Sequence, residues 1–171
     1  MVAPAPTATT TDRFTRVSSP VGDLILTGDG AALTGCFFTG PDHVTDPSAG
    51  LARDDDAFAD AAAQLGEYFA GGRTAFDLPL DPSGTAFQLR VWQQLRTIPY
   101  GATCSYAEVA RGIGSTTGFR AVGLANGRNP ISIIVPCHRV IGANGSLTGY
   151  GGGLERKRFL LDLEAGSLPF G

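Results

Sequence analysis

The chain has 171 residues, of which 43% are hydrophobic and 17% are charged, with a formal net charge of −3. This composition supports a packed core and excludes a wholly disordered chain, and no apolar run approaches the roughly 18 residues of a membrane helix. The three cysteines, at positions 36, 104 and 137, are too few and too scattered for a disulfide framework.

The N-terminal residues 1–12 are rich in Pro, Ala and Thr, which predicts a flexible tail. They lack the basic segment and apolar core of a secretion signal, so we expect a cytoplasmic protein. The next region, 13–84, predicts a small antiparallel sheet with one helix. The segment GDG at 28–30 indicates a hairpin turn between two β-rich runs. Apolar residues recur at helical spacing over 58–69, and Gly71 would end that helix.

The Pro-rich segment DLPLDPSG at 77–84 marks the expected boundary to a mostly helical second domain, 85–171. Thr85 with Gln88, and Ser105 with Glu108, predict capping boxes at the starts of two helices. The segment STTGFRAVGLANG predicts a further helix after a glycine-containing turn. Two short helices joined in this way are typical of a helix-turn-helix, whose second helix enters a DNA groove.

Charge is distributed unevenly between the two regions. Residues 1–84 carry 4 basic and 12 acidic side chains, whereas residues 85–140 carry six arginines and one glutamate. Arg120 and Arg128 belong to the predicted second helix of the helix-turn-helix. An arginine-bearing second region is suited to a phosphate backbone, so we expect it to bind DNA.

The segment IIVPCHRVIG at 133–142 places Cys137 beside His138 in an apolar run that predicts an extended segment. A thiol attacks as its thiolate, and an imidazole can take the proton. Neighbours on an extended segment point to opposite sides, so contact needs a turn after Pro136 or a bridging water. Glu164 on the final helix is the candidate that would orient the imidazole. The alternative is a core cysteine without chemistry, which we favour for Cys36 and Cys104.

The segment PCHRVI resembles the active-site signature of the methylated-DNA–protein-cysteine methyltransferases, the O-6-alkylguanine-DNA alkyltransferase family. The segments GTAFQLRVWQQLRTIPYGATCSYAEVA, RAVGLANGRNPISIIVPCHRVIGANGSLTGYGGG and KRFLLDLE are also similar to that family, in the same order. The resemblance is close over residues 85–164 and weaker over the first half.

The resemblance implies an α+β protein that binds duplex DNA and turns an alkylated guanine out of the base stack. The thiolate of Cys137 would take the alkyl group, with His138 acting through water and Glu164 orienting it. Because nothing in the sequence offers a way to remove the group from sulfur, one molecule would repair one lesion. No cofactor is expected. We expect a monomer in solution, and cooperative binding on DNA is left open.

The resemblance also assigns roles to single residues. It implies that Arg120 enters the space vacated by the base, Asn129 braces the turn that carries the nucleophile, and Tyr106 hydrogen-bonds the guanine. The expected pocket residues are Val140, Tyr150, Gly151 and Gly152. Further candidates for DNA contacts are Ser105, Thr116, Thr117, Arg128 and Arg139.

Two features depart from the family pattern. Some members bind zinc in the first domain, but here Cys36 and His43 are the only Cys and His residues of that half, so no metal is expected. Phe119 stands just before the arginine, where small residues are more usual. Two other functions stay open: a lesion-recognition protein without transfer, against which the presence of Cys137 argues, and a cysteine hydrolase, which would turn over.

Overall fold

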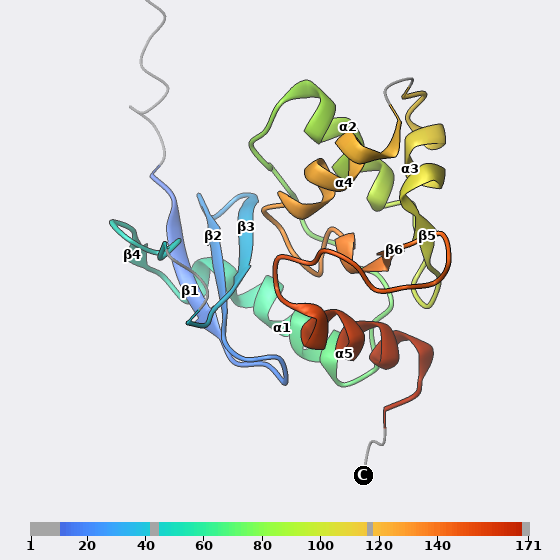
Figure 1. Ribbon diagram of the computed structural model, residues 1–171. Helices are drawn as coiled ribbons and strands as arrows, with labels where there is room; N and C mark the ends of the chain where they lie inside the picture. Colours follow the sequence, from blue (N-terminus) through green and yellow to red (C-terminus); the bar gives the residue numbers. More distant parts are fainter. Residues whose placement is uncertain (1–10, 42–44, 116–117, 169–171) are drawn as a thin grey trace, which may run out of the picture.

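The computed structural model describes residues 11–41, 45–115 and 118–168. It has a sheet-containing part on one side and a helical part on the other (Figure 1). The first part comprises β1 (Arg13–Val17), β2 (Leu24–Gly28), β3 (Leu33–Phe38), β4 (Ala52–Arg53), the 3₁₀ turn η2 (Asp56–Phe58) and α1 (Ala59–Phe69). The second comprises α2 (Ala86–Leu95), β5 (Cys104–Ser105), α3 (Tyr106–Gly112), α4 (Phe119–Gly127), the 3₁₀ turn η3 (Cys137–Arg139), β6 (Val140–Ile141) and α5 (Leu154–Ala165).

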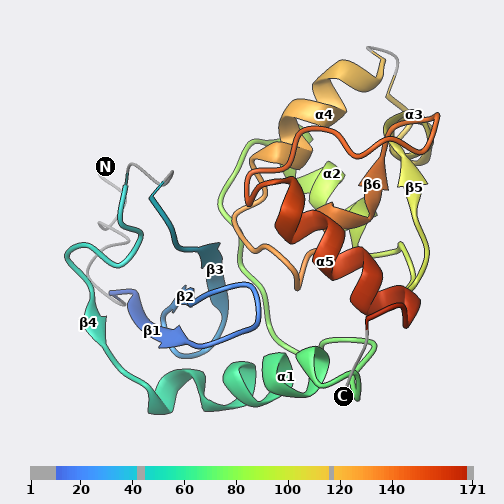
Figure 2. The same ribbon diagram turned by 60° about the horizontal axis from the view of Figure 1, so that its bottom comes forward.

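The sheet has the strand order β3-β2-β1-β4. The expected antiparallel hairpin is present, with β2 and β3 paired in register from Leu24 with Phe38. The structure adds a short parallel pair between β1 and β4, so the sheet is not antiparallel throughout. β2 is buried along its whole length; it lies between β1 and β3, and α1 lies beneath the sheet in the turned view (Figure 2).

In the second part, N-terminal caps set where two of the helices begin. Both capping boxes are present: the Thr85 side chain accepts from the Gln88 amide, and that of Ser105 accepts from the Glu108 amide. These bonds satisfy amide groups that a helix start otherwise leaves unpaired, and so fix where α2 and α3 begin. Helices α2, α3 and α4 pack against one another, and Trp92 of α2 donates to the Ala125 carbonyl of α4 at 2.8 Å.

The outer edge of β3 joins the two parts. The Cys36 amide donates to the Pro130 carbonyl at 2.9 Å, and the Ser132 amide donates to the Cys36 carbonyl at 3.0 Å. The sheet therefore holds the segment that precedes Cys137. At its other end the first part reaches α5, where the Tyr68 hydroxyl of α1 donates to Glu164 at 2.6 Å. Among the described residues, no helix is long and apolar enough to cross a membrane.

Candidate active site

Cys137 lies on a turn rather than on the extended segment that the sequence predicts. The chain turns repeatedly over residues 131–136, and Ile133 adopts a φ of 73°, which is unusual for a β-branched residue. The Asn129 amide nitrogen donates to the carbonyls of Val135 at 2.9 Å and Ile131 at 3.3 Å, and its oxygen accepts from the Ile131 amide. These three bonds hold the backbone in a conformation that the apolar side chains alone would not favour.

The 3₁₀ turn η3 brings His138 to Glu164 of α5. The distance from His138 Nε2 to Glu164 Oε2 is 2.7 Å, and both side chains are buried. The other ring nitrogen, Nδ1, is buried and has no hydrogen-bond partner among the described residues. No direct hydrogen bond joins Cys137 to His138 in this part of the chain. Of the two routes left open by the sequence, a bridging water fits this geometry.

Glu164 is held by donors from two elements, η3 and α1. The Arg139 Nε atom donates to Oε1 at 2.7 Å, the second Arg139 contact to Oε2 is 3.0 Å, and the Tyr68 hydroxyl donates to Oε2 at 2.6 Å. Burial alone would raise the pKa of the Glu164 carboxyl, but the hydrogen bonds from His138, Arg139 and Tyr68 outweigh it and lower the pKa to about 2. Glu164 is therefore ionised at neutral pH.

An ionised Glu164 determines the form of the histidine ring. A carboxylate only accepts hydrogen bonds, so His138 Nε2 carries the proton and Nδ1 presents a lone pair. Burial lowers the pKa of His138, and the Glu164 hydrogen bond opposes this without cancelling it. The ring is neutral at neutral pH, and its free nitrogen is available as a base.

The thiol of Cys137 needs such a base. Only 4% of this residue is exposed, and burial raises its pKa. The Asn129 and Tyr150 side chains and the charge of Lys157 act in the opposite direction. Because burial wins, the resting group is a thiol, and attack requires that its proton be taken up nearby.

Lys157 is a functional candidate that the sequence analysis missed. It is fully buried, and its ammonium donates to the carbonyls of Val140 at 2.6 Å and Thr148 at 3.0 Å. No carboxylate pairs with it among the described residues, so its positive charge is free to favour the thiolate. The signal in the sequence was its position seven residues before Glu164, which places both on one face of α5.

A hollow of about 580 Å³ opens beside this centre. Tyr106, Arg120, Gly123, Thr148 and Gly149 contribute to its walls. The Tyr106 hydroxyl lies 3.3 Å from both the carbonyl and the hydroxyl oxygen of Thr148. Cys137 itself does not line the hollow. The loop that begins at Thr148 lines the hollow and continues into Tyr150, whose side chain acts to lower the pKa of the Cys137 thiol.

Comparison with known proteins decides the family. Residues 86–166 match the model of the 6-O-methylguanine DNA methyltransferase DNA-binding domain, and residues 13–82 match that of the ribonuclease-like domain of the same proteins. The chain belongs to the 6-O-methylguanine DNA methyltransferase family.

Relatives of this family resemble the chain over most of its length. A methylated-DNA–protein-cysteine methyltransferase of Mycobacterium leprae is 56% identical over 149 residues, 86% of this chain and 89% of that protein. One of Methanosarcina acetivorans is 51% identical, covering 85% and 94%. The crystal structure of the Mycobacterium tuberculosis OGT in complex with DNA is 52% identical with a TM-score of 0.85, covering 92% of this chain and 95% of that one.

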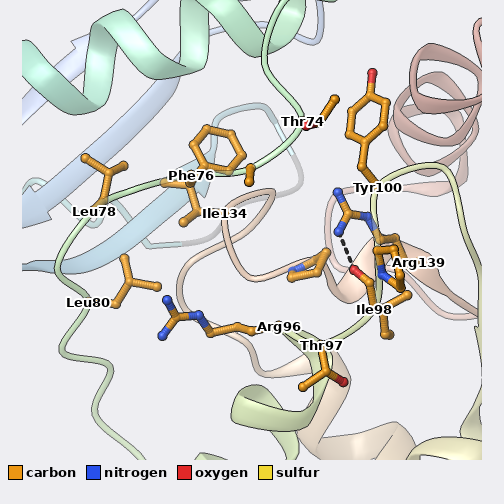
Figure 3. A pocket seen from close by; sticks show the side chains of 13 residues that line it. Thr74, Phe76, Leu78, Leu80, Arg96, Thr97, Ile98, Tyr100, Ile134 and Arg139 are labelled. Atoms are coloured by element: carbon orange, nitrogen blue, oxygen red, sulfur yellow. Dashed lines mark hydrogen bonds between the residues drawn. The ribbon is translucent and has the colours of Figure 1, made fainter.

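In this member of the family, Arg139 does not lie where the sequence predicts. We expected a DNA contact, but only 7% of the residue is exposed and its guanidinium is bound to Glu164 and to the Ile98 carbonyl. It lines a different hollow of about 530 Å³, next to Tyr100 and the connector between the two parts (Figure 3). Three of its five N–H groups are bound to Glu164 and Ile98 and the side chain is almost wholly buried, so Arg139 is a partner of Glu164 instead.

The expected pocket residues are dispersed. Val140 is fully buried, and its carbonyl is the acceptor for Lys157. Tyr150, Gly151 and Gly152 line a separate hollow of about 540 Å³ beside Arg156. The glycine-rich loop allows a close approach within the chain itself: a Cβ on Gly152 would lie 2.6 Å from the Phe38 ring.

The remaining candidates fall into two groups. Ser105 and the exposed Arg120 line the hollow at Tyr106, and Arg128 is exposed at the end of α4. Thr116, Thr117 and His43 lie outside the described residues. Within the described ranges, no group of three or more His, Cys, Asp or Glu side chains is arranged to hold a metal, and Cys36 is buried with its pKa raised to about 12 by burial.

Proposed function

We propose that this protein repairs DNA by transferring the alkyl group of an O6-alkylguanine in duplex DNA to Cys137. One observation supports this most strongly: a cysteine next to a neutral, buried histidine whose Nε2 is bound to an ionised glutamate and whose Nδ1 is left free. Membership of the 6-O-methylguanine DNA methyltransferase family supplies the substrate class.

The proposed step is an in-line displacement. A water bound at His138 Nδ1 relays the proton of Cys137 to the imidazole, and the charge of Lys157 favours the thiolate. Sulfur forms a bond to the alkyl carbon as the bond from that carbon to O6 breaks, and the electron pair goes to the guanine. The Tyr106 phenol donates a hydrogen bond that offsets the charge developing on the base.

Each protein molecule carries out this transfer once. Its product is a thioether, and the described residues near Cys137 include no second nucleophile placed to remove the alkyl group. The protein is therefore consumed in proportion to the lesions that it repairs.

Access to the thiol requires the base to leave the duplex, since a base atom inside a stack cannot be reached. We infer that α3 and α4 form a helix-turn-helix, and that the exposed Arg120 occupies the vacated position. The guanine then enters the hollow at Tyr106 and replaces the contact between Tyr106 and Thr148. Opening this contact frees the loop that covers Cys137.

We further propose two domains, 13–84 and 85–171, that act as one monomeric unit. Among the described residues of the first domain, no side chain is placed to react with the substrate. Its role is to hold the nucleophile turn through the edge of β3 and Glu164 through Tyr68. Arg128 and Ser105 are proposed as phosphate contacts on the DNA side.

Mass spectrometry tests this function. After incubation with duplex DNA that carries O6-methylguanine, transfer adds one methyl group, about 14 Da, to the peptide that contains Cys137, at one group per molecule. Tight binding with unchanged mass would instead indicate a lesion-recognition protein. Repeated release of product without an adduct would indicate a hydrolase.

Arg120→Ala should slow the repair of duplex DNA by about tenfold to 10³-fold, because holding a base out of the stack costs a few kcal/mol. Transfer from free O6-benzylguanine, which needs no extrusion, should proceed at the parent rate. The two rates are measured from the alkylated fraction of the protein over time. Equal rates for variant and parent on duplex DNA would contradict the role of Arg120 in base extrusion.

A further inference from the structure

Two large apolar side chains are exposed to solvent on the face of α4 that lines the Tyr106 hollow. Phe119, the first residue of the helix, is 61% exposed, and Leu124 is 65% exposed. Scattered apolar residues on a surface are common, but these two border the same hollow and flank Arg120 in sequence. Among the described residues, no aromatic ring stacks on Phe119.

The backbone of α4 explains why this face is open. Phe119 and Gly123 are four residues apart and share one stripe of the helix, as do Arg120 and Leu124 on the adjacent stripe. Gly123 carries no side chain, and the Tyr106 ring lies 3.8 Å from where its Cβ would be. Phe119 therefore stands at the N-terminal edge of an open apolar surface, directly beside the guanidinium-bearing residue.

An occupant of this surface must combine flat apolar faces with negative charge. Duplex DNA has both: bases that stack on aromatic rings, and phosphates that pair with arginine. The surface lies within residues 86–166, which match the DNA-binding domain of the family, and in a stretch where arginines outnumber acidic residues. Apolar side chains inserted between base steps are a known way to hold a duplex open.

We infer that Phe119 is a stacking wedge: its ring packs on the base next to the extruded guanine while Arg120 fills the vacated position. This inference rests on the proposed function and adds a second residue to base extrusion. Arg120 supplies charge and hydrogen bonds, and Phe119 supplies the apolar face that replaces the lost base stacking. Two neighbouring residues at the start of one helix thus share the task of keeping the gap open.

The kinetic test compares variants at this one position. Phe119→Ala should slow repair of duplex DNA by about 5- to 150-fold, the value of one aromatic–base stack, and should slow transfer from free O6-benzylguanine by a clearly smaller factor, because only the duplex reaction loses that stack. Phe119→Trp should retain the duplex rate, and Phe119→Leu should fall in between. Leu154→Ala, which removes a 50% exposed leucine from α5 outside the hollow, is the matched control and should not change either rate.

A spectroscopic test reports the stacking directly. The chain has a single tryptophan, Trp92, which is buried. In the Cys137→Ala background, which leaves the lesion in place, Phe119→Trp adds an exposed indole whose fluorescence should be quenched when methylated duplex DNA is added. Leu154→Trp should show no quenching.

The two proposals fail in different ways. If the parent gains its methyl group and Arg120→Ala is slow, but Phe119→Ala repairs duplex DNA like the parent and Phe119→Trp is not quenched, the wedge is refuted and the proposed function stands. If the parent gains no methyl group, the proposed function fails first. A Phe119→Ala defect of equal size on duplex DNA and on free O6-benzylguanine would show that the ring acts on the guanine in the hollow and not on the duplex, and would overturn the wedge.

Discussion

Cys137→Ala should abolish alkyl transfer to the protein and leave binding to O6-methylguanine duplex DNA within about twofold of the parent. The substitution removes the sulfur that accepts carbon and nothing that faces DNA, since only 4% of the residue is exposed. The loss is complete rather than partial because no other described side chain near the site is a nucleophile with a base beside it. Intact-protein mass and a DNA-binding titration measure the two effects.

Cys36→Ala is the control for this prediction. Cys36 is also buried, but burial raises its pKa to about 12, and within the described residues no imidazole is hydrogen-bonded to it. The control should gain the same 14 Da as the parent. A methyl adduct that persists in Cys137→Ala, or one that disappears in Cys36→Ala while DNA binding survives, would show that the nucleophile has been assigned to the wrong thiol.

The parts of the fold that sequence predicts well are those fixed by local chemistry. Thr85 and Ser105 begin their helices where the capping boxes indicate, because a side chain three residues away satisfies each exposed amide. The hairpin turn is also set locally, because Gly30 adopts a φ of 94° and the Asp29 carboxylate accepts from the Ala31 and Ala32 amides. The parallel pairing of β4 with β1 could not be foreseen, because it depends on contacts across about 40 residues.

The nucleophile turn shows where apolar pattern misleads. The run from Ile131 to Val135 predicts a strand by composition, yet the chain turns there. The cause is Asn129, whose amide forms three hydrogen bonds with the backbone of this run, together with the β3 edge that binds its start. The β3 contact is a tertiary effect that overrides residue preference, whereas the Asn129 bonds reach only two and six residues along the chain.

In the catalytic centre too, the sequence identifies residues with local signals but not the contacts that depend on tertiary packing. Cys137 and His138 stand out because they are adjacent reactive residues, and Glu164 could be named as the third member. Arg139 reads as a surface charge in the sequence, but its pairing with Glu164 depends on how α5 packs. Tyr68 is separated from Glu164 by 96 positions and belongs to the other part of the protein, so no local pattern links them.

Glu164→Gln should cost about 3–5 kcal/mol of unfolding free energy and slow alkyl transfer by at least about 10²-fold. The stability loss arises because the substitution removes one partner of a buried ion pair and leaves the charge of Arg139 uncompensated. The activity loss arises because a neutral amide no longer fixes the proton on His138 Nε2, so Nδ1 is no longer reliably the free base. Urea denaturation and the rate of transfer from O6-benzylguanine measure the two effects.

The pH dependence of the unfolding free energy distinguishes the contribution of the Glu164 charge from that of its packing. In the folded parent the pKa of Glu164 is about 2, below its ordinary value of 4.5, so its ionisation stabilises the fold above pH 4.5 and this contribution is lost as the pH falls from 4.5 towards 2. The difference in unfolding free energy between parent and Glu164→Gln should therefore shrink over that range, by roughly 3 kcal/mol in all. Glu155→Gln, on the exposed start of the same helix, should unfold within about 0.5 kcal/mol of the parent at every pH. If the difference in unfolding free energy between parent and variant stays constant with pH, Glu164 supports the fold through packing alone. That result would contradict the assignment of an ionised carboxylate that sets the histidine tautomer.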